Sequence, residues 1–247
     1  MQPEIEEKLL AINREFYQTF ADAFANSRRQ PQPGTFQLLK TVGFNQPVVD
    51  LGCGNGALAD ALHNRGHRGP YFGLDYSAGL LERAKQDCSH PHTEFIQADL
   101  AQPNWSDALP DRRFPWVFAL ALLHHIPGEQ RRQDWAGHLQ QILTDDGSVG
   151  ISVWNFSAEK RWRERVLPWS TVGLSADQVD EGDALLDWRR NGHGLRYVHQ
   201  FQVEELTSLA ANAGFRVVKQ FDIGGESGHL NRLQLWQRRS SRKQRAF

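Results

Sequence analysis

Apolar residues along this chain follow two alternating spacings, and the alternation predicts strands and helices in turn. Short apolar runs, typical of strands buried in a sheet, are followed by stretches in which apolar residues recur every three or four positions, as on one face of a helix. After a first strand that starts at Val48, the expected strands cover Tyr71 to Asp75, Glu94 to Gln97, Phe114 to Leu122, Val149 to Trp154, Phe215 to Ile223 and Asn231 to Gln237. The expected helices cover Ile5 to Asn26, Thr35 to Thr41, Ala57 to Leu62, Ala78 to Gln86, Glu129 to Leu143 and Glu204 to Ala213. This order predicts an α/β sandwich whose last two strands form a hairpin.

The same pattern divides the chain into segments. We expect an N-terminal helix and covering segment at 1–34, a core at 35–155, an insertion at 156–200, the end of the core at 201–238 and a basic tail at 239–247. The insertion is expected to lie over the ligand edge of the sheet. Its Arg161, Arg163 and Arg165 stand among tryptophans, a mixture that could meet phosphates and bases or could be a solvated helix face. The tail is a second candidate for RNA contact.

The first strand ends in Asp-Leu-Gly-Cys-Gly-Asn-Gly, residues 50–56, with glycine at every second position. Glycine has no Cβ, so this backbone can adopt unusual dihedral angles and come close to a bound molecule. A strand, glycine turn and helix could equally hold a dinucleotide, but that fingerprint is spaced Gly-x-Gly-x-x-Gly. Asp50, just ahead of the turn, would repel a pyrophosphate and attract the ammonium of an amino-acid moiety. The combination favours S-adenosylmethionine as the cofactor.

Two more acids stand at the ends of the next strands. Asp75 closes the second strand, 19 residues beyond Gly56, where an acid can accept hydrogen bonds from both ribose hydroxyls. Asp99 follows the third strand beside apolar neighbours, which suits an adenine whose amine donates to the carboxylate. Because parallel strands end at one edge of a sheet, the three acids are expected along one rim. The candidate cofactor-binding residues are Tyr17, Asp50, Gly52, Cys53, Gly54, Asn55, Gly56, Asp75, Tyr76, Ser77, Asp99, Leu100 and Leu120.

The fourth strand leads into two adjacent histidines, His124 and His125. Neighbouring side chains cannot both face one way, so we expect no metal held by this pair, and none elsewhere in the protein. Either histidine could donate to substrate or cofactor, and His124 is the preferred candidate. His125 is at least as well explained as a histidine satisfied within its loop.

Charge, cysteine count and the length of the apolar runs indicate which partners and which cellular compartment to expect. A formal net charge of −1 gives no global positive field to attract nucleic acid, so any such contact must be local. Cys53 and Cys88 make neither a disulfide framework nor a zinc set. The acidic, mixed N-terminus does not have the pattern of a secretory signal, and no apolar run approaches the ~18 residues of a membrane span. We therefore expect a cytoplasmic protein without membrane contact.

Residues from Phe36 to Trp236 resemble class I S-adenosylmethionine-dependent methyltransferases. More narrowly, the chain is similar to the tRNA wobble-uridine methyltransferases that esterify 5-carboxymethyluridine, including the methyltransferase domain of the human AlkB-type tRNA hydroxylase. The motifs that carry this likeness are Tyr17 through Arg28, Pro31 and Pro33, His124-His125-Ile126 with Arg131-Arg132, Val153-Trp154, Gly182 to Trp188, and Arg196 to His199. Gln30 and Gln32 stand where the family has Lys and Trp. The resemblance implies a Rossmann-like class I methyltransferase fold, with a seven-stranded, mostly parallel sheet, helices on both faces and an antiparallel last strand.

The resemblance also implies an activity, the methylation of a carboxymethyl carboxylate on tRNA. Such a carboxylate is already ionised at neutral pH, so catalysis would depend on alignment and would need no general base. The candidate catalytic residues are Arg28 and Arg196 as clamps, with His124, Tyr197 and His199, helped by Tyr17, orienting the acceptor. The implied partners are tRNA and a small zinc-binding activator protein. Two alternatives stay open: a methyltransferase acting on a small carboxylic acid or other metabolite, and a cofactor-binding partner subunit without catalysis.

Overall fold

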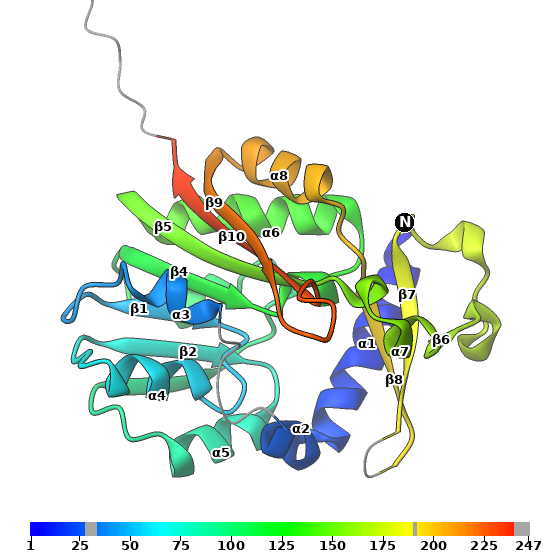
Figure 1. The fold of residues 1–247 in the computed structure, drawn as a ribbon, viewed down its shortest axis with the longest axis horizontal. Helices are drawn as coiled ribbons and strands as arrows, with labels where there is room; N and C mark the ends of the chain where they lie inside the picture. The colour runs from blue at the N-terminus through cyan, green and yellow to red at the C-terminus, as the bar shows by residue number, and fades with distance from the viewer. Residues whose placement is uncertain (28–33, 190–191, 240–247) are drawn as a thin grey trace, which may run out of the picture.

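The computed structural model describes residues 1–27, 34–189 and 192–239, and its main feature is a sheet of seven strands (Figure 1). The strands are β1 (Val48–Leu51), β2 (Tyr71–Asp75), β3 (Thr93–Gln97), β4 (Phe114–Leu120), β5 (Leu143–Trp154), β9 (Phe215–Ile223) and β10 (Asn231–Arg238). They lie in the order β3-β2-β1-β4-β5-β10-β9. The pairs from β3 to β5 are parallel, while β10 runs antiparallel to both of its neighbours. The predicted fold is therefore confirmed, including the antiparallel last strand.

Helices cover both faces of this sheet. One face carries α3 (Thr35–Leu39), α4 (Ala57–Asn64) and α5 (Ala78–Asp87), and the other carries α6 (Glu129–Ile142) and α8 (Val203–Asn212). Leu38 and Leu62 pack with Phe118 in the first layer, and Leu139 and Leu206 belong to the second. Because both faces are covered, the central strands are largely buried, which explains why β4 is almost continuously apolar.

The N-terminal helix is broken, contrary to the single helix expected over Ile5 to Asn26. The structure has α1 (Pro3–Thr19) and α2 (Ala21–Ser27), with Phe20 between them in a non-helical conformation. Neither glycine nor proline stands at the break. The rings of Phe16 and Phe20 lie 5.3 and 6.3 Å from the ring of Trp188, so both pack on a strand remote in sequence. Tertiary packing at this point overrides the local helical pattern.

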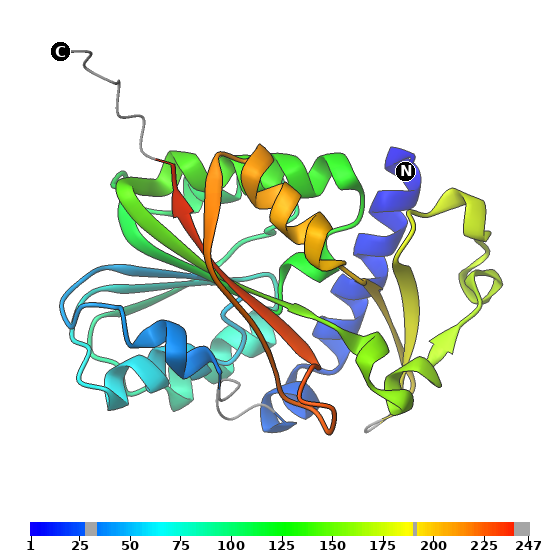
Figure 2. The same cartoon turned by 45° about the horizontal axis from the view of Figure 1, so that its top comes forward.

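The insertion forms a sheet of its own. After α7 (Lys160–Arg163), the strands β6 (Val166–Leu167), β7 (Asp183–Trp188) and β8 (Gly194–His199) pair antiparallel in that order. Helix α1 lies between this small sheet and the carboxyl edge of the large one (Figure 2). The insertion therefore packs against α1, and through Tyr197 of β8 it also contacts the turn after β4.

Several sequence predictions fall on residues 28–33, 190–191 and 240–247, which lie outside the described residues. They concern Arg28, the glutamines and prolines of residues 30–33, and most of the basic tail. Within the described part of the chain, no helix combines the length and the apolar character needed to cross a bilayer.

Candidate functional site

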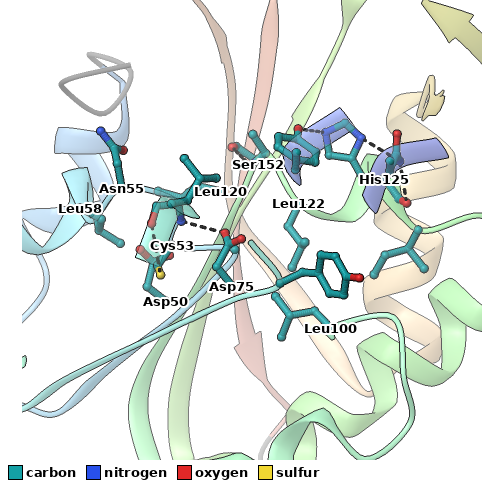
Figure 3. A pocket seen from close by; sticks show the side chains of 18 of the residues that line it. Asp50, Cys53, Asn55, Leu58, Asp75, Leu100, Leu120, Leu122, His125 and Ser152 are labelled. Atoms are coloured by element: carbon teal, nitrogen blue, oxygen red, sulfur yellow. Dashed lines mark hydrogen bonds between the residues drawn. The ribbon is translucent and has the colours of Figure 1, made fainter. Parts of the chain in front are cut away.

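A pocket of about 550 Å³ lies where the parallel strands of the large sheet end (Figure 3). Asp50, Asp75 and Asp99 all line it, so the structure brings the three strand-end acids together. Of the candidate cofactor-binding residues, those that line it are Tyr17, Asp50, Gly52, Cys53, Gly54, Asn55, Asp75, Tyr76, Asp99, Leu100 and Leu120. The rest of the lining comes mainly from α1, the turn after β4, and the strands β5 and β10. None of the described residues of the insertion lines the pocket, although Tyr197 of the insertion contacts the pocket residue His125 through its carbonyl oxygen.

Gly56 and Ser77 are the two candidates that do not line the pocket, because both are used to start helices. Gly56 is the N-cap of α4 with φ of 78°, and a Cβ there would come within 3.0 Å of the ring of Phe95. The hydroxyl oxygen of Ser77 accepts a hydrogen bond from the backbone N–H of Leu80 and donates one to the carbonyl of Tyr17. Gly56 and Ser77 thus act on the pocket indirectly, by fixing the backbone where α4 and α5 (Ala78–Asp87) begin.

The glycine turn is held against the end of β2. Both oxygens of Asp75 accept backbone hydrogen bonds of 2.9 Å, from the N–H groups of Gly54 and Ser77. Gly54 has φ of 54°, and a Cβ added to it would meet no protein atom within 4 Å, so it would project into the space that a ligand needs. The cradle therefore fits a ligand that comes close to the backbone. A carboxylate has about four acceptor sites, so Asp75 can still accept from a ribose hydroxyl.

Asp50 is a buried carboxyl group, only 3% exposed, that accepts a 2.5 Å hydrogen bond from the hydroxyl of Tyr71. Burial raises the pKa of Asp50 to about 7, the bond from Tyr71 opposes this, and the nearby Asp75 adds to it. A cation entering the pocket would relieve both the burial penalty and the repulsion. The site is therefore arranged to gain from a positively charged ligand.

Asp99 forms a salt bridge with Arg14, which is not among the candidate site residues predicted from the sequence. Arg14 of α1 lies 2.5 Å from Oδ2 of Asp99 and is also paired with Glu7 at 3.4 Å. Arg131 of α6 contacts Glu6 at 2.8 Å and Glu7 at 3.1 Å. This chain of ion pairs fixes α1 across the end of the pocket at Asp99. The sequence of α1 does not reveal it, because Asp99 and Arg131 come from distant segments of the chain.

His125, and not the preferred His124, stands at the pocket wall. The Nε2 atom of His125 lies 2.8 Å from the hydroxyl of Tyr17, and its Nδ1 atom lies 3.0 Å from the carbonyl oxygen of Tyr197. His124 is 1% exposed, with its ring stacked on Trp154, and its Nδ1 accepts from the Trp154 backbone N–H. In the 3₁₀ turn Leu123–His125 the two ring centroids lie 4.2 Å apart, yet of the two histidines it is His125 that lines the pocket.

Arg196, Tyr197 and His199 do not line the pocket either. The guanidinium of Arg196 is surrounded by aromatic rings, at 4.7 Å from that of Trp154 and 4.9 Å from that of Phe16. These residues are almost completely buried, because β8 lies between β7 and α1. The sequence could not show this, since polar side chains in a motif look alike whether they face a ligand or the interior.

A buried polar network holds β8 in place. Asp183 accepts from the hydroxyl of Tyr197 and from Nδ1 of His199, both at 2.7 Å, and Nε2 of His199 lies 2.7 Å from Glu205. Burial by itself lowers the pKa of His199, but the bonds to the two carboxylates outweigh it and raise that pKa. The backbone of Tyr197 is fixed from the other side by Asn13, through bonds of 2.9 and 3.1 Å. The network therefore sets the position of the carbonyl that binds His125.

The backbone after β4 is strained where it meets the pocket. Ala121 has φ of 57°, in the left-handed region that non-glycine residues seldom adopt. Its N–H donates to the hydroxyl oxygen of Ser152 at 2.9 Å. Ser152 of β5 and Asn231 of β10 also line the pocket, and neither was selected from the sequence. Their only sequence signal is a polar residue at the ligand end of an apolar strand.

Comparison with known proteins assigns a class to this fold and site. Residues 48–147 match the family model described as a methyltransferase domain. Within the described residues, no group of three or more His, Cys, Asp or Glu side chains is arranged to hold a metal ion. The protein is an S-adenosylmethionine-dependent methyltransferase with the class I fold.

Three proteins similar in sequence to this chain are methyltransferases by name. A protein named as a methyltransferase from Encephalitozoon cuniculi is 26% identical over 87% of this chain and 90% of its own length. The tRNA (carboxymethyluridine(34)-5-O)-methyltransferase of Schizosaccharomyces pombe is 24% identical over 82% of this chain and 88% of its own. The trans-aconitate 2-methyltransferase of Escherichia coli is 28% identical, with 75% of each chain covered.

Solved structures agree on the fold. A methyltransferase from Methanosarcina mazei matches with a TM-score of 0.63 at 15% identity, over 85% of this chain and 98% of that one. A methyltransferase from Haloferax volcanii, in complex with the Trm112 methyltransferase activator, matches with a TM-score of 0.62 at 17% identity, over 91% and 96% of the two chains.

Proposed function

We propose that this enzyme converts a carboxylate to its methyl ester, and that its acceptor is the 5-carboxymethyl group of wobble uridine in tRNA. Two kinds of relative support a carboxylate acceptor. By its name, the Schizosaccharomyces pombe protein acts on carboxymethyluridine 34 of tRNA, and the Escherichia coli protein acts on trans-aconitate. Both acceptors carry carboxylates, although they differ greatly in size.

The distribution of charge in the pocket is the observation that carries the proposal. The carboxylates among its described lining residues are Asp50, Asp75 and Asp99, which come from β1, β2 and the loop after β3. The opposite side, toward β5 and β10, is lined by neutral hydrogen-bonding groups that include Ser152 and Asn231. Arg14, which also lines the pocket, compensates Asp99, so Asp50 and Asp75 are the carboxylates that suit a cationic methyl donor. An anionic acceptor suits the second side, where no described carboxylate would repel it.

The proposed roles follow from this division. S-adenosylmethionine, when bound, supplies an electrophilic methyl group on a positively charged sulfur. Asp50 would hold its ammonium, Asp75 its ribose hydroxyls, and Asp99 with Leu100 its adenine. A carboxylate needs no base to attack, so the work of the protein is to hold the reactants in line, an effect that can supply ~7 to 11 kcal/mol.

On the acceptor side, Tyr17 and His125 would orient the substrate, and Arg28 remains the proposed clamp. We no longer assign contact with the acceptor to His124, Arg196, Tyr197 or His199, which the structure buries behind the pocket wall. They act instead as positioning residues, because they fix the Tyr197 carbonyl and α1.

A small carboxylic acid is the second candidate acceptor, supported by the likeness to trans-aconitate 2-methyltransferase. We further propose a small activator protein as partner, since a similar fold is found in complex with Trm112. A cytoplasmic location is proposed on the free thiols of Cys53 and Cys88, which suit a reducing compartment.

Transfer of labelled methyl groups tests the acceptor. The purified chain, alone and with a co-expressed activator, is given S-adenosylmethionine labelled in the methyl group and one of three acceptors. These are an anticodon stem-loop RNA with 5-carboxymethyluridine, the same RNA with plain uridine, and trans-aconitate. We expect label in the carboxymethyl RNA and not in its uridine control. Label in trans-aconitate alone would favour the second candidate, and label in neither carboxylate would contradict the proposal.

A further inference from the structure

We propose that Asn231 binds the methyl acceptor, by donating a hydrogen bond from its side-chain amide to an oxygen of the acceptor carboxylate. The inference rests on the proposed function, which names a carboxylate as the group to be methylated. Asn231 is the first residue of β10 and lines the pocket.

The amide nitrogen of Asn231 is buried without a partner. The residue is 3% exposed, and its Nδ2 atom makes no hydrogen bond to any described residue. Among the described residues that line the pocket, it is the one with such an orphaned nitrogen. Buried N–H donors are nearly always paired, because leaving one unpaired costs free energy. A ligand oxygen in the pocket would complete the pairing.

The position of Asn231 in the sheet assigns it to the acceptor and not to the cofactor. Asp50 is on β1, and the other two acids follow on the side of β2 and β3. Asn231 is on β10, which is reached from β1 through β4 and β5. With neighbouring strands ~4.8 Å apart, these three steps separate the strands by ~14 Å. A cofactor held by the acids leaves the β10 side of the pocket for the second substrate.

Asn231 also interrupts an apolar surface. The register pairs Ser152 with Leu233 and Trp154 with Asn231, so these side chains lie on one face of the sheet. Farther from the pocket, the same face carries core residues such as Phe118. Where this face reaches the pocket, Ser152 and Asn231 stand among these apolar side chains. An apolar residue would pack there without an unpaired donor, so folding alone does not explain the amide.

Gln234, on the opposite face of β10, shows what a structural amide looks like in this strand. It is fully buried, its Nε2 donates to Gln220 at 2.6 Å and to Thr207 at 3.1 Å, and its Oε1 accepts from Trp236 at 2.7 Å. Both ends of that amide are satisfied by protein atoms. Gln234 therefore offers a matched control for a substitution that removes a buried amide.

The test compares Asn231→Leu, Asn231→Asp and the control Gln234→Leu in the full chain, with its activator if required. The measurements are kcat and KM for the carboxymethyluridine stem-loop and for trans-aconitate, Kd for S-adenosylmethionine by calorimetry, and Tm. For N231L we expect kcat/KM to fall about ten- to hundredfold, the size of a hydrogen bond to a charged group. Cofactor Kd should stay within about twofold, and Tm should be unchanged or higher. For N231D we expect kcat/KM to fall further, because the introduced carboxylate would repel the carboxylate of the acceptor. For Q234L we expect a lower Tm and an unchanged KM.

Each other result has a distinct meaning. If N231L keeps the wild-type kcat/KM on an acceptor that the wild type methylates, the inference alone is overturned. If cofactor Kd rises by the same factor as kcat/KM falls, Asn231 belongs to the cofactor site, and the inference is again overturned. If the wild type methylates neither carboxylate, the proposed function fails, and the inference falls with it.

Discussion

The hydroxyl of Tyr17 lies 2.8 Å from Nε2 of His125, so helix α1 is hydrogen-bonded to the turn after β4 at the wall of the pocket. The other ring nitrogen of His125 lies 3.0 Å from the carbonyl oxygen of Tyr197. A carbonyl only accepts, so Nδ1 carries a proton and Nε2 of the neutral ring accepts from Tyr17. The oxygen of Tyr17 is thereby held with its hydrogen turned toward His125.

Substitution of either residue should slow methyl transfer. Tyr17→Phe removes one hydrogen bond of ~0.5–1.5 kcal/mol, which predicts a roughly two- to tenfold lower kcat/KM with a small change in Tm. At position 125, glutamine can offer an oxygen near the place of Nε2, whereas asparagine reaches only the place of Nδ1. We therefore expect H125Q to be more active than H125N in steady-state kinetics. The reverse order would mean that the bond to Tyr17 has no part in the reaction.

Cofactor binding should release a proton from Asp50. Burial raises the pKa of Asp50 to about 7, so this group is largely protonated in the free protein at pH 6. The ammonium of the cofactor favours the carboxylate, so binding shifts the group to its ionised form. Affinity should therefore rise roughly fivefold between pH 6 and pH 7, as the ionised fraction grows. Calorimetry at pH 6 in buffers of different ionisation enthalpy measures the proton directly.

Asp50→Asn is the control for this titration. The amide has no proton to release, so its binding should be weaker and nearly independent of pH over the same range. Measurements should stay below about pH 7.5, because an α-amino group itself loses its charge near pH 8. Proton release that persists in D50N would assign the effect to another group.

The hydrophobic pattern and the spacing of the acids were sufficient to predict the large sheet and the gathering of Asp50, Asp75 and Asp99, because both are local features repeated at successive strands. The choice between His124 and His125 could not be predicted, since one short turn decides which side chain faces the pocket. The helix break at Phe20 depends on Trp188, a residue remote in sequence. Tyr197 and His199 were predicted as site residues, but they are held in a buried network with Asp183 and Glu205. The sequence could not show this, because the network joins β7, β8 and α8, which come together only in the fold.

A histidine pair away from the pocket should make the fold sensitive to acid. Nδ1 of His67 lies 2.9 Å from Nε2 of His90, and the other nitrogen of His67 lies 2.8 Å from the carbonyl of Gln46. Burial, with repulsion from His67 and other neighbouring histidines, lowers the pKa of His90 to about 4, well below the ~6.5 of an unfolded chain. The unfolded state therefore binds the extra proton first, and stability should fall as the pH drops from about 6.5 to 4.

His90→Gln tests this directly, because glutamine can donate to His67 at every pH. Between pH 7 and pH 4.5, the wild type should lose roughly 3–8 °C more in Tm than H90Q does. The exposed His193, changed to glutamine, is the control and should follow the wild type. Parallel Tm curves for wild type and H90Q would show that the pair does not titrate on unfolding.

The chemical nature of the transferred label tests the central claim most directly. Product labelled from the methyl group of S-adenosylmethionine is treated with mild alkali, and volatile methanol is counted. If the enzyme esterifies a carboxylate, nearly all of the label should leave as methanol, whichever acid is the natural acceptor. Label that stays on the product through this treatment would place the methyl group on a nitrogen, carbon or ether oxygen, and would contradict the account.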